Sequence, residues 1–177
     1  MLTETLPSIL DLRQAVVRGV TVSGVLKPRD LKRFRPLLAG DEGTISAAVV
    51  FSYDEERRYV MHVATAANVV VTCQRCLEAM PEHLSSESTL AIVWTDEEAA
   101  HVPRHLDSWV VMDSPSNLWE IVEDELILAL PPFSYHETDE CKLKTAAYSD
   151  PIPAEDEGEK KPNPFNVLAQ LKPGNRH

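Results

Sequence analysis

The 177-residue sequence contains few cysteines and no long hydrophobic run. Three cysteines are an odd number, and nothing marks the chain for export, so reduced thiols or thiolate ligands are favoured over a disulfide framework. No apolar stretch approaches the roughly 20 residues of a transmembrane helix. Glu4 and Asp11 interrupt the N-terminus where a signal peptide would need its apolar segment. We therefore expect a soluble, cytoplasmic protein that makes no use of a membrane.

Positive charge is also scarce, since 17 Lys and Arg stand against 28 Asp and Glu, a net charge of −11. This balance argues against a protein that coats nucleic acid by electrostatics alone, because phosphate binding depends on lysine and arginine. The basic residues gather near the N-terminus, where residues 1–37 are net positive. We favour the solvated face of a short helix for this segment; the candidate nucleic-acid contacts in it are Lys27, Arg29, Lys32, Arg33 and Arg35.

Familiar catalytic motifs are missing as well. The sequence contains no Gly-x-Ser-x-Gly, no His-Glu-x-x-His and no Walker lysine loop. His101 and His105 have a spacing that would suit a metal on a helix, but Pro103 between them disfavours that helix. Because no nucleophile stands beside a recognisable base, we infer a binding or assembly protein and not an enzyme.

Hydrophobic periodicity predicts an α+β fold with an antiparallel sheet or open barrel. A period of two begins at residue 45 and indicates strands over 45–53, 59–64 and 68–73, and composition indicates further strands over 19–26, 88–95 and 107–113. A period near 3.6, with its capping and stop signals, indicates helices over 9–17, 28–38 and 117–130. Asn117 caps the last helix and Pro131 ends it. The expected domain covers residues 1–147, with helix 117–130 packed across the sheet.

Glu125 breaks the pattern of helix 117–130. Spacing the residues by about 100° places it near the middle of the apolar face and places Glu123 outside that face. A buried carboxylate indicates either a structural ion pair or a group with a raised pKa that serves acid–base chemistry. We favour the ion pair, with Arg75 as a candidate partner.

The C-terminal region has a different composition. Residues 148–162 are acidic, contain several prolines and lack the apolar residues of a core, which predicts a disordered linker. Residues 163–172 predict a short helix, because Asn163 and Pro164 suit its start. A helix this short is unstable alone, so we expect it to dock on its own domain or on a partner. The residues expected to dock are Phe165, Leu168 and Leu171.

The remaining signal is the Cys-x-x-Cys of Cys73 and Cys76. This spacing is typical of zinc knuckles and of thiol-redox sites, and it also arises by chance. His136 and Cys141 would complete a Cys₃His set, which is a known class of structural zinc site. A redox role is disfavoured because the pair follows a strand instead of opening a helix. Zinc and inert thiols both remain open interpretations.

Three segments together resemble the large ribosomal RNA subunit accumulation protein family of bacteria, the YceD family. They are "CQRCLEAM", "VEDELILALPPFSYHETDEC" and "KPNPFNVLAQLK". The resemblance covers nearly the whole chain. It implies a non-enzymatic factor for the accumulation, processing or assembly of large-subunit ribosomal RNA. The implied partner is the precursor large ribosomal subunit, contacted through RNA, a ribosomal protein or an assembly factor. The alternative is a small zinc-dependent or thiol-redox enzyme.

Overall fold

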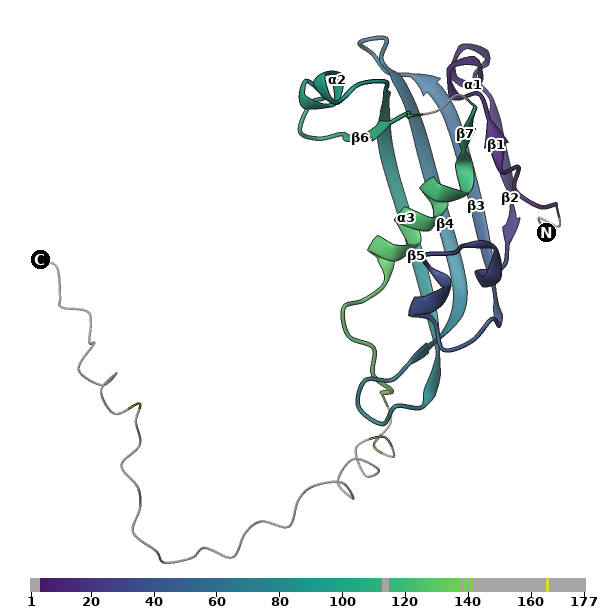
Figure 1. Ribbon diagram of the computed structural model, residues 1–177, viewed down its shortest axis with the longest axis vertical. Coiled ribbons are helices and arrows are strands. Elements are labelled where there is room, and N and C mark those ends of the chain that lie inside the picture. Colours follow the sequence, from purple (N-terminus) through teal and green to yellow (C-terminus); the bar gives the residue numbers. More distant parts are fainter. Residues whose placement is uncertain (1–3, 113–114, 138, 140, 142–164, 166–177) are drawn as a thin grey trace, which may run out of the picture.

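The computed structural model describes residues 4–112, 115–137, 139, 141 and 165. They form an α+β fold with one five-stranded sheet, whose strands lie side by side in chain order (Figure 1). The sheet is open, because β2 and β6 are its two edges. Its strands are β2 (Thr21–Leu26), β3 (Gly43–Tyr53), β4 (Tyr59–Thr72), β5 (Ala79–Val93) and β6 (Asp107–Val110).

The long hairpin of β4 and β5 is the largest paired unit of the sheet. Antiparallel pairing runs without a break from Val60 opposite Ala91 to Thr72 opposite Ala79. The two strands expected over 59–64 and 68–73 are therefore one strand. The first nine residues of β5, from Ala79, were not predicted as strand, because proline, histidine, glutamate and serine alternate there and have low strand propensity. Pairing with the apolar β4 overrides that local preference. The sheet is also not wholly antiparallel, since β6 pairs with β5 in parallel.

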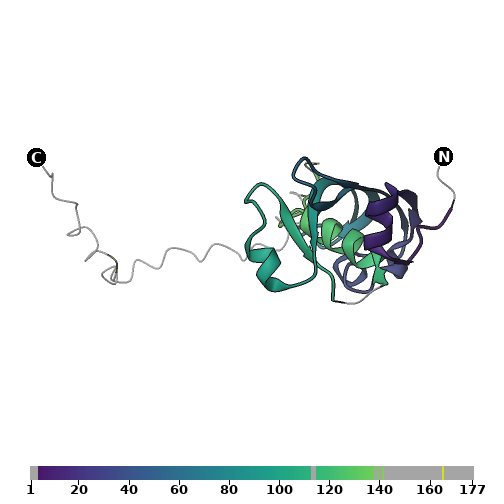
Figure 2. The same cartoon turned by 90° about the horizontal axis from the view of Figure 1, so that it is seen from above.

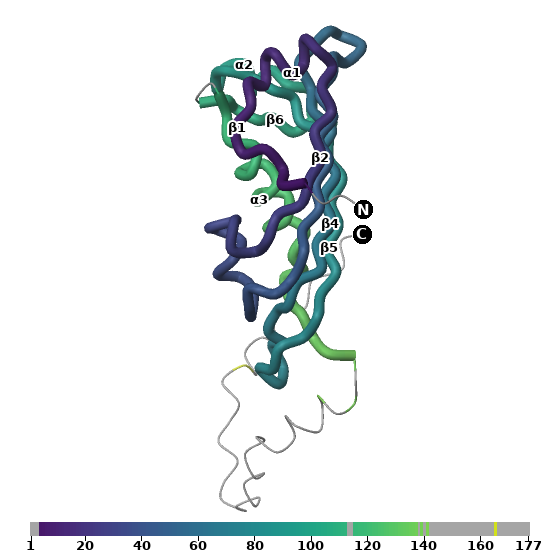
Figure 3. The backbone as a smooth tube through the Cα atoms, turned by 90° about the vertical axis from the view of Figure 1, so that its right-hand side faces the viewer, coloured from purple at the N-terminus to yellow at the C-terminus, as the bar shows by residue number. Residues whose placement is uncertain are grey.

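The core lies between the sheet and the elements on one of its faces. Figure 3 shows α1 (Leu12–Arg18), α3 (Leu118–Ala129) and the segment 27–38 on that side of the sheet. The period-two pattern of β3 buries Ile45, Val49 and Phe51 there, and α3 contributes Leu118, Ile121, Val122 and Leu126. Viewed from above, α2 (Asp96–Ala100) and β6 lie at one side of the domain, and α1 and β2 lie at the other (Figure 2). Helix 117–130 is thus confirmed in place and in packing.

The N-terminal helices differ from the sequence prediction. Helix α1 begins after Asp11, whose side chain accepts a hydrogen bond from the backbone N–H of Gln14 at 2.9 Å, and it ends at Gly19 with φ of 60°. The two residues before Asp11 are not helical. They form β1 (Ile9–Leu10), which pairs with β7 (Ser116–Asn117).

The helix expected over 28–38 is wrong. The segment contains two single 3₁₀ turns, η1 (Pro28–Asp30) and η2 (Arg35–Leu37). Pro36 removes a backbone donor inside the expected helix, and Glu123 captures the backbone N–H groups of Arg33 and Phe34. The apolar residues that suggested helical spacing are instead buried one by one, with Leu31 and Phe34 in the core.

Among the described residues, no helix is long and apolar enough to cross a membrane. The predicted linker 148–162 lies outside the described residues, and so does the predicted helix 163–172 apart from Phe165, which is exposed. Leu168 and Leu171 therefore keep the status of predicted docking residues.

Candidate metal centre

The turn between β4 and β5 carries the first two candidate ligands, Cys73 and Cys76. Cys73 closes the turn through its backbone, because its N–H donates to the carbonyl of Glu78 at 2.8 Å and its carbonyl accepts from the N–H of Leu77 at 2.9 Å. Leu77 adopts a left-handed conformation, with φ of 62°, and its side chain is exposed. Left-handed backbone is unfavourable for leucine. The turn therefore holds strain at the point where the chain folds back past the two thiols.

The chain after α3 brings the other two candidate ligands to the same turn. The backbone N–H of Gln74 donates to the carbonyl of Ser134 at 2.9 Å, which fixes the segment beyond Pro132 to the β4–β5 turn. Ser134 is buried at this junction. His136 and Cys141 follow on the same segment and reach the cysteine pair, although about 60 residues separate them from it in sequence.

The four candidate ligand atoms form one compact group. The sulfur atoms of Cys73, Cys76 and Cys141 and a ring nitrogen of His136 all lie within 4.8 Å of one another. Sγ of Cys73 is 3.6 Å from Sγ of Cys141, and Sγ of Cys76 is 3.3 Å from Nδ1 of His136. A tetrahedral zinc ion with Zn–S bonds of about 2.3 Å separates its sulfur ligands by about 3.8 Å. The residues therefore fit zinc after a contraction of about 1 Å along the longest edge.

The surroundings of the thiols also shift the pKa values of Cys73 and Cys141. Burial would raise the pKa of Cys73, but hydrogen bonds from the backbone N–H groups of Cys76, His136 and Arg75 outweigh it and lower the pKa to about 5. Burial and the neighbouring Cys73 and Cys76 sulfurs raise the pKa of Cys141. Cys73 therefore gives up its proton more readily than Cys141 does. A metal ion binds thiolates, so binding would release the protons that the thiols still carry.

Arg75 belongs to this cluster and not to Glu125. Its guanidinium Nη1 lies 4.0 Å from Sγ of Cys141, and its Cζ lies 5.0 Å from the ring centre of Tyr135. The prediction of an Arg75–Glu125 ion pair is therefore wrong. Glu125 is buried as expected, but Oε2 accepts a 2.6 Å hydrogen bond from the hydroxyl of Ser86 on β5. The arginine instead supplies positive charge beside the sulfur of Cys141.

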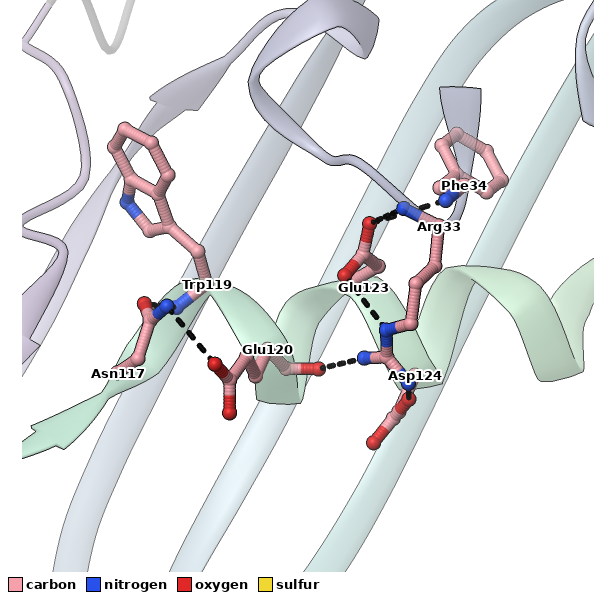
Figure 4. Close-up of polar contacts among 7 residues, drawn as sticks. All are labelled: Arg33, Phe34, Asn117, Trp119, Glu120, Glu123 and Asp124. Carbon is pink, nitrogen blue, oxygen red and sulfur yellow. Dashed lines mark hydrogen bonds and ion pairs between the residues drawn. The ribbon is translucent and has the colours of Figure 1, made fainter. Parts of the chain in front are cut away.

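The buried carboxylate of α3 that forms an ion pair is Glu123, which the helical projection had placed outside the apolar face. Oε1 of Glu123 accepts the backbone N–H of Phe34 at 3.0 Å, and Oε2 accepts Nε of Arg33 at 3.0 Å (Figure 4). Arg33 also contacts Asp124 at 2.7 Å. A helical projection treats only one helix. It misses Glu123 because the segment 31–34 covers that side of α3.

Two of the five basic residues of the N-terminal segment form ion pairs. Arg33 is engaged by α3, and Arg35 pairs with Asp41. Lys27, Arg29 and Lys32 are exposed and form no ion pair among the described residues. A nucleic acid would therefore meet three uncommitted charges here.

Comparison with known proteins adds a family match. Residues 61–172 match the model of the large ribosomal RNA subunit accumulation protein YceD family. The chain is also similar to the large ribosomal RNA subunit accumulation protein YceD of Haemophilus influenzae, with 29% identity over 168 residues that cover 94% of this chain and 96% of that protein. No solved structure matches the chain. The matched region contains all four candidate ligands and α3, and the basic segment 27–35 precedes it.

Proposed function

Because the chain belongs to the YceD family of large ribosomal RNA subunit accumulation proteins, we propose that it is a non-enzymatic factor that acts on the precursor large ribosomal subunit in the cytoplasm. The observation that carries this proposal is the end-to-end similarity to a protein of that name. The factor promotes accumulation of large-subunit ribosomal RNA by aiding its processing or assembly. It contacts the precursor through RNA, a ribosomal protein or another assembly factor.

Zinc has a structural part in this proposal. Cys73, Cys76, His136 and Cys141 would hold one ion, which would tie the β4–β5 turn to the segment that leaves α3. The donor set, the 3.6 and 3.3 Å contacts and the lowered pKa of Cys73 support this assignment. A structural zinc site has four protein ligands and no open position, and this set provides four.

Two other parts of the chain are proposed contacts with the precursor. Lys27, Arg29 and Lys32 can reach phosphates, since they are exposed and unpaired among the described residues. Arg33 and Arg35 contribute less, because acidic side chains already neutralise them. The residues Phe165, Leu168 and Leu171 form a second contact, which docks into a groove of a partner.

Sedimentation tests the proposal directly. Lysate of cells that express the tagged protein is separated on a sucrose gradient at low magnesium, and the protein should travel with particles that contain precursor large-subunit RNA. Depleting the protein should reduce large-subunit RNA and leave small-subunit RNA at its normal level. A protein that stays at the top of the gradient, in cells whose two RNA levels do not change, would contradict the proposal.

The thiol-redox alternative is favoured by one observation, the lowered pKa of Cys73. Its burial opposes that alternative, because Cys73 is fully buried and a disulfide substrate must reach the attacking sulfur. The two functions separate in a thiol–disulfide exchange assay of the purified protein with oxidised glutathione. Turnover that Cys73→Ser abolishes, while Cys76→Ser only slows it, would favour the enzyme over the assembly factor.

A further inference from the structure

Strand β6 has an edge that no described residue pairs with. The backbone N–H of Val111 donates to the carbonyl of Val93 at 2.8 Å, so the backbone hydrogen-bonding groups of Val111 point toward β5. The side to which these groups point alternates from one residue to the next along a strand. Asp107 and Trp109 therefore also face β5, and the backbone groups of Ser108 and Val110 face away from it. No other described residue bonds to these outward groups.

An aromatic cavity borders β6 at Trp109. Its volume is about 640 Å³, and Trp109 of β6 and Trp119 of α3 both line it. A smaller cavity of about 170 Å³ adjoins it between β6 and β7, since Ile9, Trp109, Asn117 and Glu120 line both. The indole N–H of Trp119 is bound to the carbonyl of Leu6 at 2.9 Å, which fixes that ring as a wall. A side chain that entered this cavity would thus meet two indole rings.

The surroundings of β6 are strongly acidic. Residues 96–125 include nine Asp or Glu and a single Arg, and no Lys. Glu120 and Asp107 are exposed at the cavity and on β6 itself. Arg33 and Lys32 both line the larger cavity, together with Asp30, Glu120, Glu123 and Asp124, so the charged residues of its lining sum to −2. Glu123 and Asp124 pair with Arg33. A lining with net negative charge favours cationic side chains over phosphates.

We propose that the free edge of β6 binds an extended, arginine-containing protein segment by strand addition, with one arginine stacked in the cavity lined by Trp109 and Trp119. The outward groups of Ser108 and Val110 supply the backbone hydrogen bonds, and the indoles and carboxylates select arginine. This inference rests on the proposed function, and it makes the partner a basic protein of the precursor large subunit. Lys32 also lines the cavity, so RNA binding at this surface is the competing outcome of the test.

A substitution can remove the edge without removing charge. Ser108 is exposed, and its N–H points away from β5, so Ser108→Pro deletes an outward donor and keeps the β5–β6 pairing. Glu120→Lys tests the charge at the cavity. Glu87→Lys is the matched control, because Glu87 is exposed on β5 and makes the same change of charge outside the cavity.

The probe is a fluorescein-labelled ten-residue peptide of alternating arginine and valine, titrated with the full chain in 150 mM salt. We expect Ser108→Pro and Glu120→Lys each to weaken binding at least tenfold, and Glu87→Lys to change it less than threefold. Equal binding by folded Ser108→Pro and the unsubstituted protein would overturn the proposal. So would a ten-nucleotide single-stranded RNA that binds as tightly as the peptide and loses affinity in Ser108→Pro.

Hydrogen exchange provides a measurement that needs no variant. Peptide binding should slow exchange of the Ser108 and Val110 amides at least tenfold, and exchange that does not change there overturns the proposal. The peptide test is independent of sedimentation. A protein that binds the peptide at β6 but never sediments with precursor subunits contradicts the proposed function alone. A protein whose sedimentation is unaffected by Ser108→Pro, and whose β6 amides stay unprotected, contradicts only this inference.

Discussion

Glu123 and Arg33 are 90 positions apart in the sequence, and the carboxylate of Glu123 joins both the guanidinium and the backbone N–H of Arg33. The same carboxylate accepts the backbone N–H of Phe34, whose side chain is fully buried. This one side chain therefore anchors the irregular segment between η1 and η2 to α3 (Figure 4).

Removing the Glu123 carboxylate should destabilise the fold. Glu123→Ala leaves the N–H of Phe34 and that of Arg33 without an acceptor, and we expect a loss of about 2 to 4 kcal/mol in the free energy of unfolding. Urea denaturation measures it. Glu120→Ala is the control on the same helix, because Glu120 is exposed, and it should cost less than about 1 kcal/mol. Equal losses from the two variants would show that the Glu123 contacts are unimportant for stability.

Thr65 offers an opportunity to stabilise the domain. Its hydroxyl oxygen is buried on β4 and has no hydrogen-bond partner among the described residues. Valine has the same branched shape, so Thr65→Val should raise the free energy of unfolding by about 1 kcal/mol. Thr72→Val, at an exposed position of the same strand, should have little effect. A less stable Thr65→Val would indicate that the hydroxyl has a bonding partner, such as a buried water.

Metal analysis tests the candidate centre. Protein purified under reducing conditions without chelators should contain about one zinc per chain, and a chelator should lower its thermal midpoint. His136→Ala should lower the zinc content, whereas His83→Ala, which changes an exposed histidine of β5, should not. Freshly purified protein that contains no zinc, and whose thermal midpoint does not change with the chelator, would contradict the assignment of a zinc site.

The strain at Leu77 predicts an unusual response to glycine. Leu77→Gly should raise stability by about 1 kcal/mol, because glycine adopts a φ of 62° without penalty and the lost side chain is exposed. Leu128→Gly removes an equally exposed leucine from the ordinary helical backbone of α3 and should lower stability by about 1 kcal/mol. Thermal denaturation of both variants decides the matter. The prediction fails if the two changes have the same sign.

The C-terminal segment is tested by deletion. Removing residues 149–177 should leave the domain folded and weaken its association with precursor large subunits, and Phe165→Ala should reproduce much of that loss. Removing only residues 173–177 is the control, because it keeps Phe165, Leu168 and Leu171. Circular dichroism and sedimentation measure the two effects. An unfolded product would instead place the docking site of the tail on its own domain.

The sequence predicted structural features that depend on a single helix or strand. The capped helix begun by Asn117 and the alternation of β3 could both be identified from local pattern, and the structure confirms their placement. The Cys₃His set joins two distant segments and was proposed from residue type alone; the structure brings its four candidate ligand atoms within 4.8 Å of one another. Other relationships between distant segments were missed. Glu123 is buried by residues 31–34, and the polar start of β5 is held by β4. In both cases tertiary contact overrides a local preference, and no local pattern contains that information.

The length of the β4–β5 hairpin sets the distance between two of the proposed sites. The cysteine and histidine cluster lies at one end of this hairpin, and Ser108 pairs with Ala91 near the other. Twelve residues of strand separate Ala79 from Ala91, which at about 3.3 Å each is about 40 Å. A paired hairpin of this length is a rigid strut. Crosslinkers attached at its two ends should therefore react with sites about 40 Å apart on a particle that binds both ends.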